Sequence, residues 1–328
     1  MAAEEALPGG DGLSYAAAGV DVAAYTRMLE RVLGLIAATQ GPEVVTGVGP
    51  FAALYRLPGG ELLAASADGV GTKIKVAIAY GRHRGIGHDL VNHCVNDIAT
   101  AGARPLFLMD YFASGRLEEA VFSEVMTGLA EACSAAGCAL LGGETAEMPG
   151  VYALGDYDLA GFVVGRVEPR RREPVRPGDL LVGLPSSGLH TNGFSLVRRV
   201  FEDVPLDRVE PGLGRPLGEA LLEPHRCYLH QMRSLPWKAA AHITGGGLPA
   251  NLPRALPEDL AAEVDRSAWE VPPIFELIAR RGRIPDEEML GTFNMGLGMV
   301  LVTSEPLPDL PVVGRVVRRS GSRRVTFR

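Results

Sequence analysis

The sequence predicts a mixed α/β protein of two domains, and three observations support this fold class. The chain has 328 residues, enough for two domains of roughly 100 to 200 residues each. Helix-like and strand-like segments follow one another, with one hairpin signal, which favours an α+β or mixed-sheet arrangement over a purely doubly wound sheet. Residues 166–178, RVEPRRREPVRPG, lack periodicity and are rich in proline and arginine, as linkers are. We therefore expect an N-terminal domain at 1–168 and a C-terminal α/β domain at 169–328.

The N-terminal half begins with a predicted helix. Apolar residues recur at helical spacing over 20–38, and Gly41-Pro42 ends that pattern. The turn sequence Pro58-Gly59-Gly60 then joins two short β-like runs into a hairpin. The same criteria predict strands at 51–57, 61–67, 106–112, 139–141 and 159–167, and helices at 86–101 and 117–136.

In the C-terminal half, the alternation of strands and helices starts again after the linker. No repeat of 20 to 50 residues is present, which argues against solenoids and propellers. The patterns predict strands at 179–184, 239–243, 260–264, 298–303, 312–317 and 324–327, and helices at 194–200, 224–235 and 273–280.

Composition excludes several classes of function. The net charge is −7, and no run of basic residues exceeds the three arginines at 170–172, so we expect no nucleic-acid partner. No stretch reaches the roughly 18 apolar residues of a membrane span. Residues 1–12 are acidic and lack an apolar core, unlike a signal or transit peptide. The four cysteines form no CxxC pair, so we expect reduced thiols and a cytoplasmic location.

A glycine-rich segment after a predicted strand carries the first candidate site. It reads Asp68-Gly69-Val70-Gly71-Thr72-Lys73 and places a carboxylate, a hydroxyl and an ammonium around two glycines. Such a loop can hold a metal and wrap a polyphosphate with backbone amides. It is not a Walker A loop, because the order is Thr-Lys and the four-residue spacer is missing. The alternative is a simple glycine-rich turn capped by the aspartate.

The predicted helix at 86–101 has a polar face of unusual composition. A solvated helix face normally carries long charged side chains. This one carries short groups that could bind a ligand, and Asp97 could join Asp68 in binding Mg²⁺, which prefers oxygen ligands. A plain surface helix is the alternative. The polar face consists of Asp89, Asn92, His93, Asn96, Asp97 and Thr100.

Three further loops carry candidate ligand-binding residues. Gly142, Gly143 and Glu144 follow the short strand at 139–141, where two glycines permit close approach of a ligand and the glutamate offers a third carboxylate. The loop at 185–193, PSSGLHTNG, groups hydroxyls, an imidazole and a carboxamide before a helix, although a simple N-cap loop would need only one of them. The loop His242-Ile243-Thr244-Gly245-Gly246-Gly247 is a natural phosphate cradle. We interpret the remaining histidines as surface or core residues, namely His83, His88, His225 and His230.

Taken in order, these segments resemble the phosphoribosylformylglycinamidine cyclo-ligase family, also called aminoimidazole ribonucleotide synthetases. The resemblance runs over nearly the whole chain. One departure is Gly49-Pro50-Phe51-Ala52, where the family tends to have a further glycine and where Pro50 removes an amide donor. The matching segments are Ser14-Tyr15, residues 18–21, DGVGTK, the 92–97 helix, Asp110-Tyr111, GGETAEMPG, SSGLHTNG and HITGGG.

The resemblance implies a fold, a reaction and a set of cofactors. It implies a homodimer in which the N-terminal domains pair strands across the dimer axis into a central barrel. The implied reaction is the ATP-dependent cyclisation of formylglycinamidine ribonucleotide to aminoimidazole ribonucleotide, with release of ADP and phosphate. ATP and Mg²⁺ are the implied cofactors, and a small phosphoribosyl compound is the implied substrate.

The resemblance also implies roles for particular residues. Asp68, Asp97 and Glu144 would bind magnesium, and Lys73 and Thr72 would contact the phosphates directly. His190 would transfer a proton, because the pKa of a histidine can lie near 7. Catalysis would involve His190, Asn192 and Lys73. ATP would be bound by Asp68, Gly69, Gly71, Thr72, Lys73, Asn96, Asp97, Gly142, Gly143 and Glu144, and substrate by Ser187, His190, Thr191, Asn192, His242, Thr244, Gly245, Gly246 and Gly247.

Two other readings are open. One is another ATP-using member of the same superfamily, such as a selenophosphate synthetase, a thiamin monophosphate kinase or a hydrogenase maturation protein. Some of those chemistries use a reactive cysteine near one end of the chain, and here no cysteine lies in the first 90 or last 100 residues. The other is a non-catalytic nucleotide-sensing dimer, which the presence of all three acidic residues disfavours.

Overall fold

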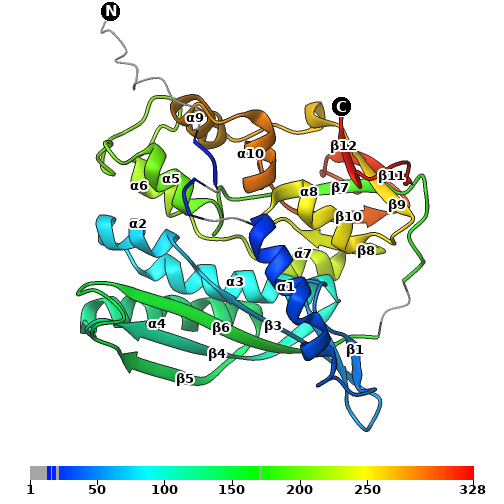
Figure 1. Ribbon diagram of the computed structural model, residues 1–328, viewed down its shortest axis with the longest axis horizontal. Helices are drawn as coiled ribbons and strands as arrows, with labels where there is room; N and C mark the ends of the chain where they lie inside the picture. Colours follow the sequence, from blue (N-terminus) through cyan, green and yellow to red (C-terminus); the bar gives the residue numbers. More distant parts are fainter. Residues whose placement is uncertain (1–12, 16, 20–21, 170–171) are drawn as a thin grey trace, which may run out of the picture.

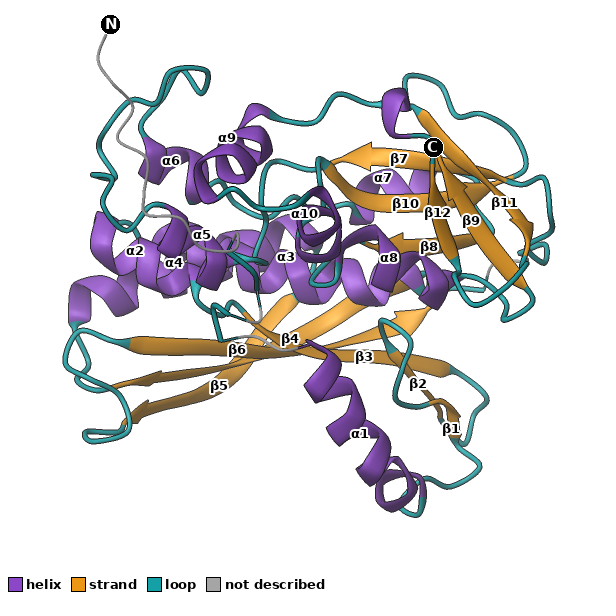
Figure 2. Ribbon diagram, turned by 45° about the horizontal axis from the view of Figure 1, so that its top comes forward, coloured by secondary structure: helices purple, strands orange, loops and turns teal. Residues whose placement is uncertain are grey.

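The structure consists of two six-stranded sheets with helices between them. It is a computed structural model that describes residues 13–15, 17–19, 22–169 and 172–328. The strands of the first sheet all come from the N-terminal half of the chain, and those of the second sheet from the C-terminal half. Figures 1 and 2 show the helices α2, α3 and α4 on one side of the first sheet, facing the C-terminal half, whereas α1 lies apart from this layer, near β1 and β2. Two mixed α/β domains therefore meet along a helical layer.

The first sheet is mostly antiparallel. Its strand order is β1-β2-β3-β6-β4-β5, and only β4 and β5 run parallel. The predicted hairpin is confirmed as the antiparallel pair of β2 and β3. The strands are β1 (Val44–Thr46), β2 (Ala53–Arg56), β3 (Leu62–Gly69), β4 (Ala103–Ser114), β5 (Ala139–Glu147) and β6 (Tyr157–Val167).

One face of the first sheet is covered by helices. The central helix is α3, whose apolar residues Leu90, Val91 and Cys94 are fully buried. It crosses α4 closely, because a Cβ on Gly128 would lie only 1.9 Å from the carbonyl oxygen of Arg84. The helices of this half are α1 (Val22–Ala37), α2 (Lys73–Tyr80), α3 (Arg84–Thr100) and α4 (Glu119–Ala136).

The other face of the first sheet is bare in this single chain. Large apolar side chains on β4, β5 and β6 remain exposed there, with exposed fractions of 41% for Met109, 62% for Leu141 and 43% for Phe162. Apolar side chains gathered on one sheet face usually mark an interaction surface.

The second sheet has the strand order β12-β9-β11-β7-β10-β8, and β12 alone runs parallel to its neighbour β9. Its strands are β7 (Leu180–Pro185), β8 (Ala239–His242), β9 (Leu260–Val264), β10 (Leu297–Thr303), β11 (Val312–Arg318) and β12 (Val325–Phe327). Its helices are α5 (Phe194–Val200), α6 (Leu217–Leu221), α7 (Leu229–Ser234), α8 (Gly247–Asn251), α9 (Pro273–Gly282) and α10 (Asp286–Thr292), with 3₁₀ turns η1 (Leu252–Ala255) and η2 (Arg266–Ala268).

The structure corrects the sequence expectations in two places. The expected loop after 139–141 is part of β5, which continues to Glu147, and the expected helix at 224–235 begins only at Leu229. The elements β1, α6 and α10 were not predicted. The predictions for residues 1–12, for Val20 and Asp21 and for part of the arginine run lie outside the described residues. In the described part of the chain, no helix has the length and apolar character needed to cross a membrane. The four cysteines are free thiols.

Candidate active site

The polar face of α3 lies against a C-terminal segment, residues 223–228, rather than against solvent. The Asn92 side-chain amide donates to the carbonyl oxygen of His225 at 2.7 Å. Asn96 donates to the carbonyl of Arg226 and accepts from the amide of Tyr228, both at 2.8 Å. Asn96 was expected to bind ATP, but its amide group is buried and already paired in this contact. The short side chains on this face therefore join the two domains.

The surroundings of Lys73 differ from those expected at the predicted site. Its ammonium group is completely buried, lies 2.8 Å from a carboxylate oxygen of Asp89, and donates to the carbonyl oxygen of Glu223 at 2.8 Å. Burial lowers the pKa of Lys73 and raises that of Asp89, and the attraction between the two groups opposes both shifts. In this structure the Lys73 ammonium group is enclosed by protein groups and faces no open site. The expected catalytic and phosphate-binding role of Lys73 therefore stays a prediction.

Beside that pair lies a buried chain of histidines that connects Asp68 to Asp97. We call it the histidine chain, and it consists of His93, Thr191, His225 and His242. His93 lies 2.8 Å from Asp68 through Nε2 and 3.0 Å from the Thr191 hydroxyl through Nδ1. The hydroxyl lies 3.5 Å from Nδ1 of His225, whose Nε2 lies 3.0 Å from Nε2 of His242. Nδ1 of His242 then lies 2.8 Å from Asp97.

The donors and acceptors of the histidine chain balance if His93 carries the only extra proton. His93 then donates to Asp68 and to the Thr191 oxygen, and Thr191 donates to His225. His225 donates to His242, which donates to Asp97. With this assignment of hydrogens every ring nitrogen in the chain has a partner. The chain crosses the domain boundary twice, because Asp68, His93 and Asp97 belong to the N-terminal half.

The pKa shifts agree with this assignment. Burial opposes the charge on His93, but the Asp68 carboxylate raises the pKa of His93 to about 9. Burial lowers the pKa of His242 and holds that of His225 well below its usual value. Although burial alone would raise the pKa of Asp68, the charge and hydrogen bond of His93 lower it. The cluster therefore contains one imidazolium between two carboxylates and keeps its other rings neutral.

Asp68 and Asp97 belong to one cluster around His93, and this cluster could hold a metal ion. The ligand atoms of His93, Asp97 and His242 lie within 4.8 Å of one another. Asp68 also accepts from the amide of Gly69, and Asp97 from the hydroxyl of Ser66. The side chain of Asp68 remains 34% exposed, which gives a ligand access to the pair from one side.

Glu144 is not brought to this pair within one chain. Gly143 lies in register with Asp110 on β4, and Asp110 with Gly161 on β6, which in turn faces Asp68 on β3. Three strand spacings of about 4.8 Å separate the strand of Glu144 from that of Asp68, or about 14 Å. The expectation that all three acids converge is thus unmet in a single chain. Packing explains why residue 143 is a glycine, since a Cβ there would lie 2.2 Å from the Asp110 carbonyl oxygen.

Two predicted residues of the 185–193 loop have unpaired polar atoms. Nδ1 of His190 and Nδ2 of Asn192 are buried and have no hydrogen-bond partner among the described residues. Nε2 of His190 accepts from the amide of Ser187, so the neutral ring carries its hydrogen on the free Nδ1. Burial holds the pKa of His190 well below its usual value, which corrects the expectation of a proton-transfer group near neutrality. His190 is placed to donate a hydrogen bond.

The other predicted members of this loop bond to protein. The Ser187 hydroxyl donates to the carbonyl oxygen of Pro224 at 2.6 Å, and Thr191 belongs to the histidine chain. On the N-terminal side, Gly71 has φ of +70°, and the Thr72 hydroxyl lies 3.2 Å from that of Ser195. Gly71 and Thr72 are exposed and open to a ligand, whereas Gly142 is an exposed residue of β5.

Asn251 shapes the HITGGG loop. Its side-chain amide donates to the carbonyl oxygens of Thr244, Gly245 and Gly247 at 2.8 to 3.3 Å. In a trans peptide the following N–H points away from the carbonyl, so the amides of Gly245 and Gly246 point away from Asn251. Neither amide has a protein partner in the described part of the chain. The loop therefore offers two free amide donors beside Asn192, whose Oδ1 would lie 3.1 Å from a Cβ on Gly245.

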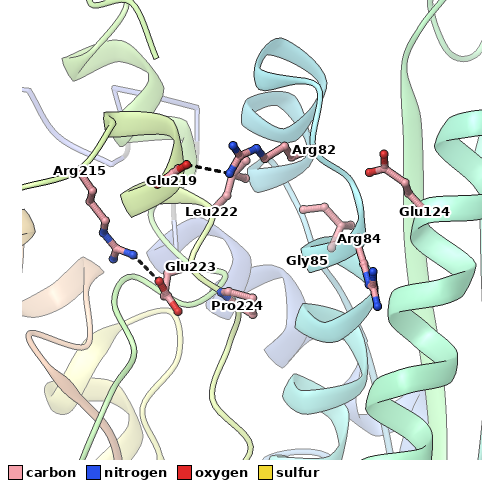
Figure 3. A pocket seen from close by; sticks show the side chains of 10 residues that line it. Arg82, Arg84, Gly85, Glu124, Arg215, Glu219, Leu222, Glu223 and Pro224 are labelled. Atoms are coloured by element: carbon pink, nitrogen blue, oxygen red, sulfur yellow. Dashed lines mark hydrogen bonds and ion pairs between the residues drawn. The ribbon is translucent and has the colours of Figure 1, made fainter. Parts of the chain in front are cut away.

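A second pocket lies along the same domain boundary, and Glu223 is one of the residues that line it. It has a volume of about 560 Å³, and Figure 3 shows the Arg82–Glu219 and Arg215–Glu223 pairs along its wall. Arg84, the third arginine that lines it, pairs with Glu131. Each cation of the pocket thus has an acidic partner.

Sequence reasoning missed several residues of the site. His225 was interpreted as a surface or core residue, yet it lies at the centre of the histidine chain, and its ring stacks on that of His190 with centroids 3.9 Å apart. The position of His93 on the polar face of its helix was a usable signal. For His225 no periodicity or glycine-rich motif marked the residue. Phe51 lies 6.5 Å from the His242 ring, and the guanidinium of Arg254 covers Phe51.

The fold and the site define a class: two-domain mixed α/β proteins with a polar site where the domains meet. Residues 49–167 match the model for the N-terminal domain of AIR synthase related proteins, and residues 176–319 match the model for the C-terminal domain. The chain belongs to this family.

Relatives with high sequence identity share one name. A phosphoribosylformylglycinamidine cyclo-ligase of Myxococcus xanthus is 52% identical over 90% of this chain and 89% of its own length. One from an Anaeromyxobacter species is 50% identical over 89% of each chain.

Solved structures of more distant proteins have the same fold. The thiamine monophosphate kinase of Aquifex aeolicus has a TM-score of 0.60 at 17% identity and covers 90% of this chain and 94% of its own. The E. coli protein HypE has a TM-score of 0.58 at 20% identity and covers 92% of this chain and 93% of its own. At these identities the likeness shows the fold alone.

Proposed function

We propose that the protein is an ATP-dependent cyclo-ligase that converts formylglycinamidine ribonucleotide into aminoimidazole ribonucleotide, with release of ADP and phosphate. The observation that carries this proposal is the identity of about half of all residues, over nine-tenths of the chain, to relatives named for that activity. The site between the domains supports it, because it combines two carboxylates, free amide donors and buried polar side chains.

The chemistry explains why ATP is needed. Ring closure requires an amidine nitrogen to attack an amide carbonyl carbon and the carbonyl oxygen to leave. Hydroxide is a poor leaving group, whereas the same oxygen leaves easily as phosphate after it receives the γ-phosphoryl group. The protein must then position the two reactants and balance the phosphate charge. A cytoplasmic site for this reaction stays a prediction.

Asp68 and Asp97 would hold magnesium, the ion that the family resemblance implies. Asp68 stands at the end of β3 and is open to one side, and Asp97 reaches the same cluster from α3, so a hard cation with oxygen ligands fits there. Bound magnesium would offset the negative charge of the phosphates. The exposed Gly71 and Thr72, together with Gly69, would border the polyphosphate.

The loops of the C-terminal half, at 185–193 and 242–247, would bind the ribonucleotide substrate. His190 and Asn192 each offer a buried N–H group without a partner among the described residues. These would donate to oxygens of the ribonucleotide, of which the formylglycinamidine group supplies one, the formyl oxygen. The free amides of Gly245 and Gly246, beside Thr244, would accept the ribose phosphate. Ser187, Thr191, His242 and Gly247 would act by holding these loops in place, since their polar groups bond to protein.

We further propose that the protein is a homodimer that covers the bare face of the first sheet. The exposed Met109, Leu141 and Phe162 support this arrangement, and a strand-paired barrel would cover them. Glu144 is in register with Tyr111, which is itself 39% exposed, so Glu144 belongs to the same region. Any metal-binding role of Glu144 would therefore depend on the second subunit.

The test is ATP consumption by the purified protein with three different acceptors. We expect ADP formation only with formylglycinamidine ribonucleotide, and one aminoimidazole ribonucleotide per ADP by mass spectrometry. ADP formed with thiamin monophosphate instead would favour the kinase reading. Nucleotide binding without turnover on any acceptor would favour a nucleotide sensor.

A further inference from the structure

Arg254 has an unusual environment for an exposed arginine. It lies in η1, shortly after the HITGGG loop, and three residues from two segments contact its side chain. Nε donates to the carbonyl oxygen of Gly49 at 2.9 Å, and Nη1 donates to Oδ1 of Asn251 at 3.1 Å. The guanidinium carbon lies 3.8 Å from the centroid of the Phe51 ring. Ordering a long side chain costs conformational entropy, so some feature must make a fixed guanidinium favourable here.

The environment contains no acidic contact to explain this ordering. No carboxylate of the described residues lies within ion-pair distance of Arg254, although most other arginines near the domain boundary have one. Gly49 and Asn251 are neutral acceptors and use two of the five N–H groups of the guanidinium. The others have no protein partner in the part of the chain that the structure describes. They form a donor fork that suits two oxygens of one phosphate.

The position of Arg254 points to the metal end of the site. Phe51 neighbours both Arg254 and His242, and His242 bonds to Asp97. Asp68 and Asp97 are also the two acids whose charges act on the guanidinium. These carboxylates are close enough to attract the arginine, yet neither forms an ion pair with it. A phosphate bound between them would meet a cation on one side and the proposed metal on the other.

The loop with Pro50 helps to position Arg254. Proline has no N–H group, so this loop cannot act there as an amide cradle. It instead supplies the Gly49 carbonyl and the Phe51 ring to the guanidinium. Phe51 is only 8% exposed, which makes the ring a fixed support rather than a mobile cover.

We propose that Arg254 contacts phosphate oxygens of a bound substrate, with Phe51 and Asn251 as its positioning residues. The proposal rests on the proposed function for the identity of the substrates, and it adds a residue that the motif-bearing loops do not include. The ligand chemistry is a phosphate group, supplied either by the metal-bound triphosphate of ATP or by the ribonucleotide. The contact would act in binding, so its loss should appear mainly in KM.

The test compares Arg254→Gln, Arg254→Lys and Arg319→Gln in the full-length protein. Arg319 is a matched control, because it is exposed, donates to backbone carbonyls and has no acidic partner among the described residues. We expect Arg254→Gln to raise the KM for ATP or for the ribonucleotide by about 10- to 100-fold. Arg254→Lys should recover part of the loss, since it keeps the charge but not the fork. The substrate whose KM changes identifies the phosphate.

A separate measurement keeps this test independent of turnover. Equilibrium dialysis of Mg-ATP and of the ribonucleotide against the same variants measures binding alone. If wild-type protein binds these ligands but does not turn them over, the proposed cyclisation fails while the role of Arg254 is still measured. Unchanged KM values and unchanged binding of both ligands in Arg254→Gln would overturn the proposal, as would an equal loss in Arg319→Gln.

Discussion

Two polar clusters lie side by side between the domains, and they use acidic residues of the same helix in opposite ways. Asp89 pairs with Lys73, and neither side chain has any exposed surface. Asp97, two turns along α3, bonds to His242 and belongs to the same cluster as Asp68, whose side chain is one-third exposed. One cluster is enclosed on all sides and the other is open to a ligand.

The difference shows that residue type and motif do not separate a structural pair from a binding site. Lys73 stands in the glycine-rich segment and Asp89 on the polar helix face, just where ligand-binding residues were expected. The segment at 223–228 decides the outcome, because it caps Lys73 with the carbonyl of Glu223 and Asp89 with the amide of His225. The first cluster should therefore control stability and the second activity.

The largest effect is expected from Lys73→Met. This substitution leaves the Asp89 carboxylate buried without its cation, which costs about 3–5 kcal/mol of unfolding free energy. Urea unfolding measures the loss. The matched control is Lys75→Met, because Lys75 pairs with Asp156 at a site where both side chains are partly exposed. The control should lose less than about 1 kcal/mol. Equal losses in the two variants would show that the enclosed pair contributes no more to stability than an exposed one.

Asp97→Asn should show the opposite result. Asparagine keeps the shape of the side chain and can still accept from His242, so the fold and the dimer should remain. Loss of the carboxylate charge at the proposed metal should lower kcat by about 100- to 1,000-fold. The control is Asp259→Asn, which changes an exposed aspartate that is not one of the proposed site residues. Turnover in Asp97→Asn equal to that of the control would remove Asp97 from the mechanism.

The fold and the first half of the site could be predicted because their signals are local. Helix α3 has apolar residues on one side and short polar residues on the other, and this pattern places Asp97 on the polar face, which the structure shows to be buried. The glycine-rich segment marks the end of β3 in the same way. Both patterns depend on neighbours within a few residues.

The other half of the site could not be predicted, because it depends on contacts between segments that are distant in the sequence. Nothing near Lys73 in the sequence indicates that Glu223, 150 residues away, will cover it. His225 has no motif of its own, and its partners come from both domains. In β5 the residues are exposed on both faces, so the alternation that predicts a strand is absent and pairing with β4 alone holds the strand.

The smallest expected effect concerns how the free energy of unfolding varies with pH. Two groups of histidines change it in opposite directions. His190, His225 and His242 have lowered pKa values in the folded protein, so the unfolded chain takes up their protons first as the pH falls below about 6.5. Stability should therefore decrease on acidification. His93 works in the other direction, because its pKa is raised to about 9. Its contribution is complete below about pH 6.5 and is lost as the pH rises through about 9.

Between pH 7 and 8 the loss from His93 should exceed the gain from the three neutral rings. The net fall is roughly 1 kcal/mol in unfolding free energy by urea titration, and the onset of ionisation of the cysteines in the unfolded chain, with a pKa of about 8.5, adds a few tenths of a kcal/mol of it. His93→Gln should remove most of this fall. His230→Gln, which removes an exposed ring, should keep the wild-type slope. A wild-type slope in His93→Gln would mean that the histidine chain holds no imidazolium.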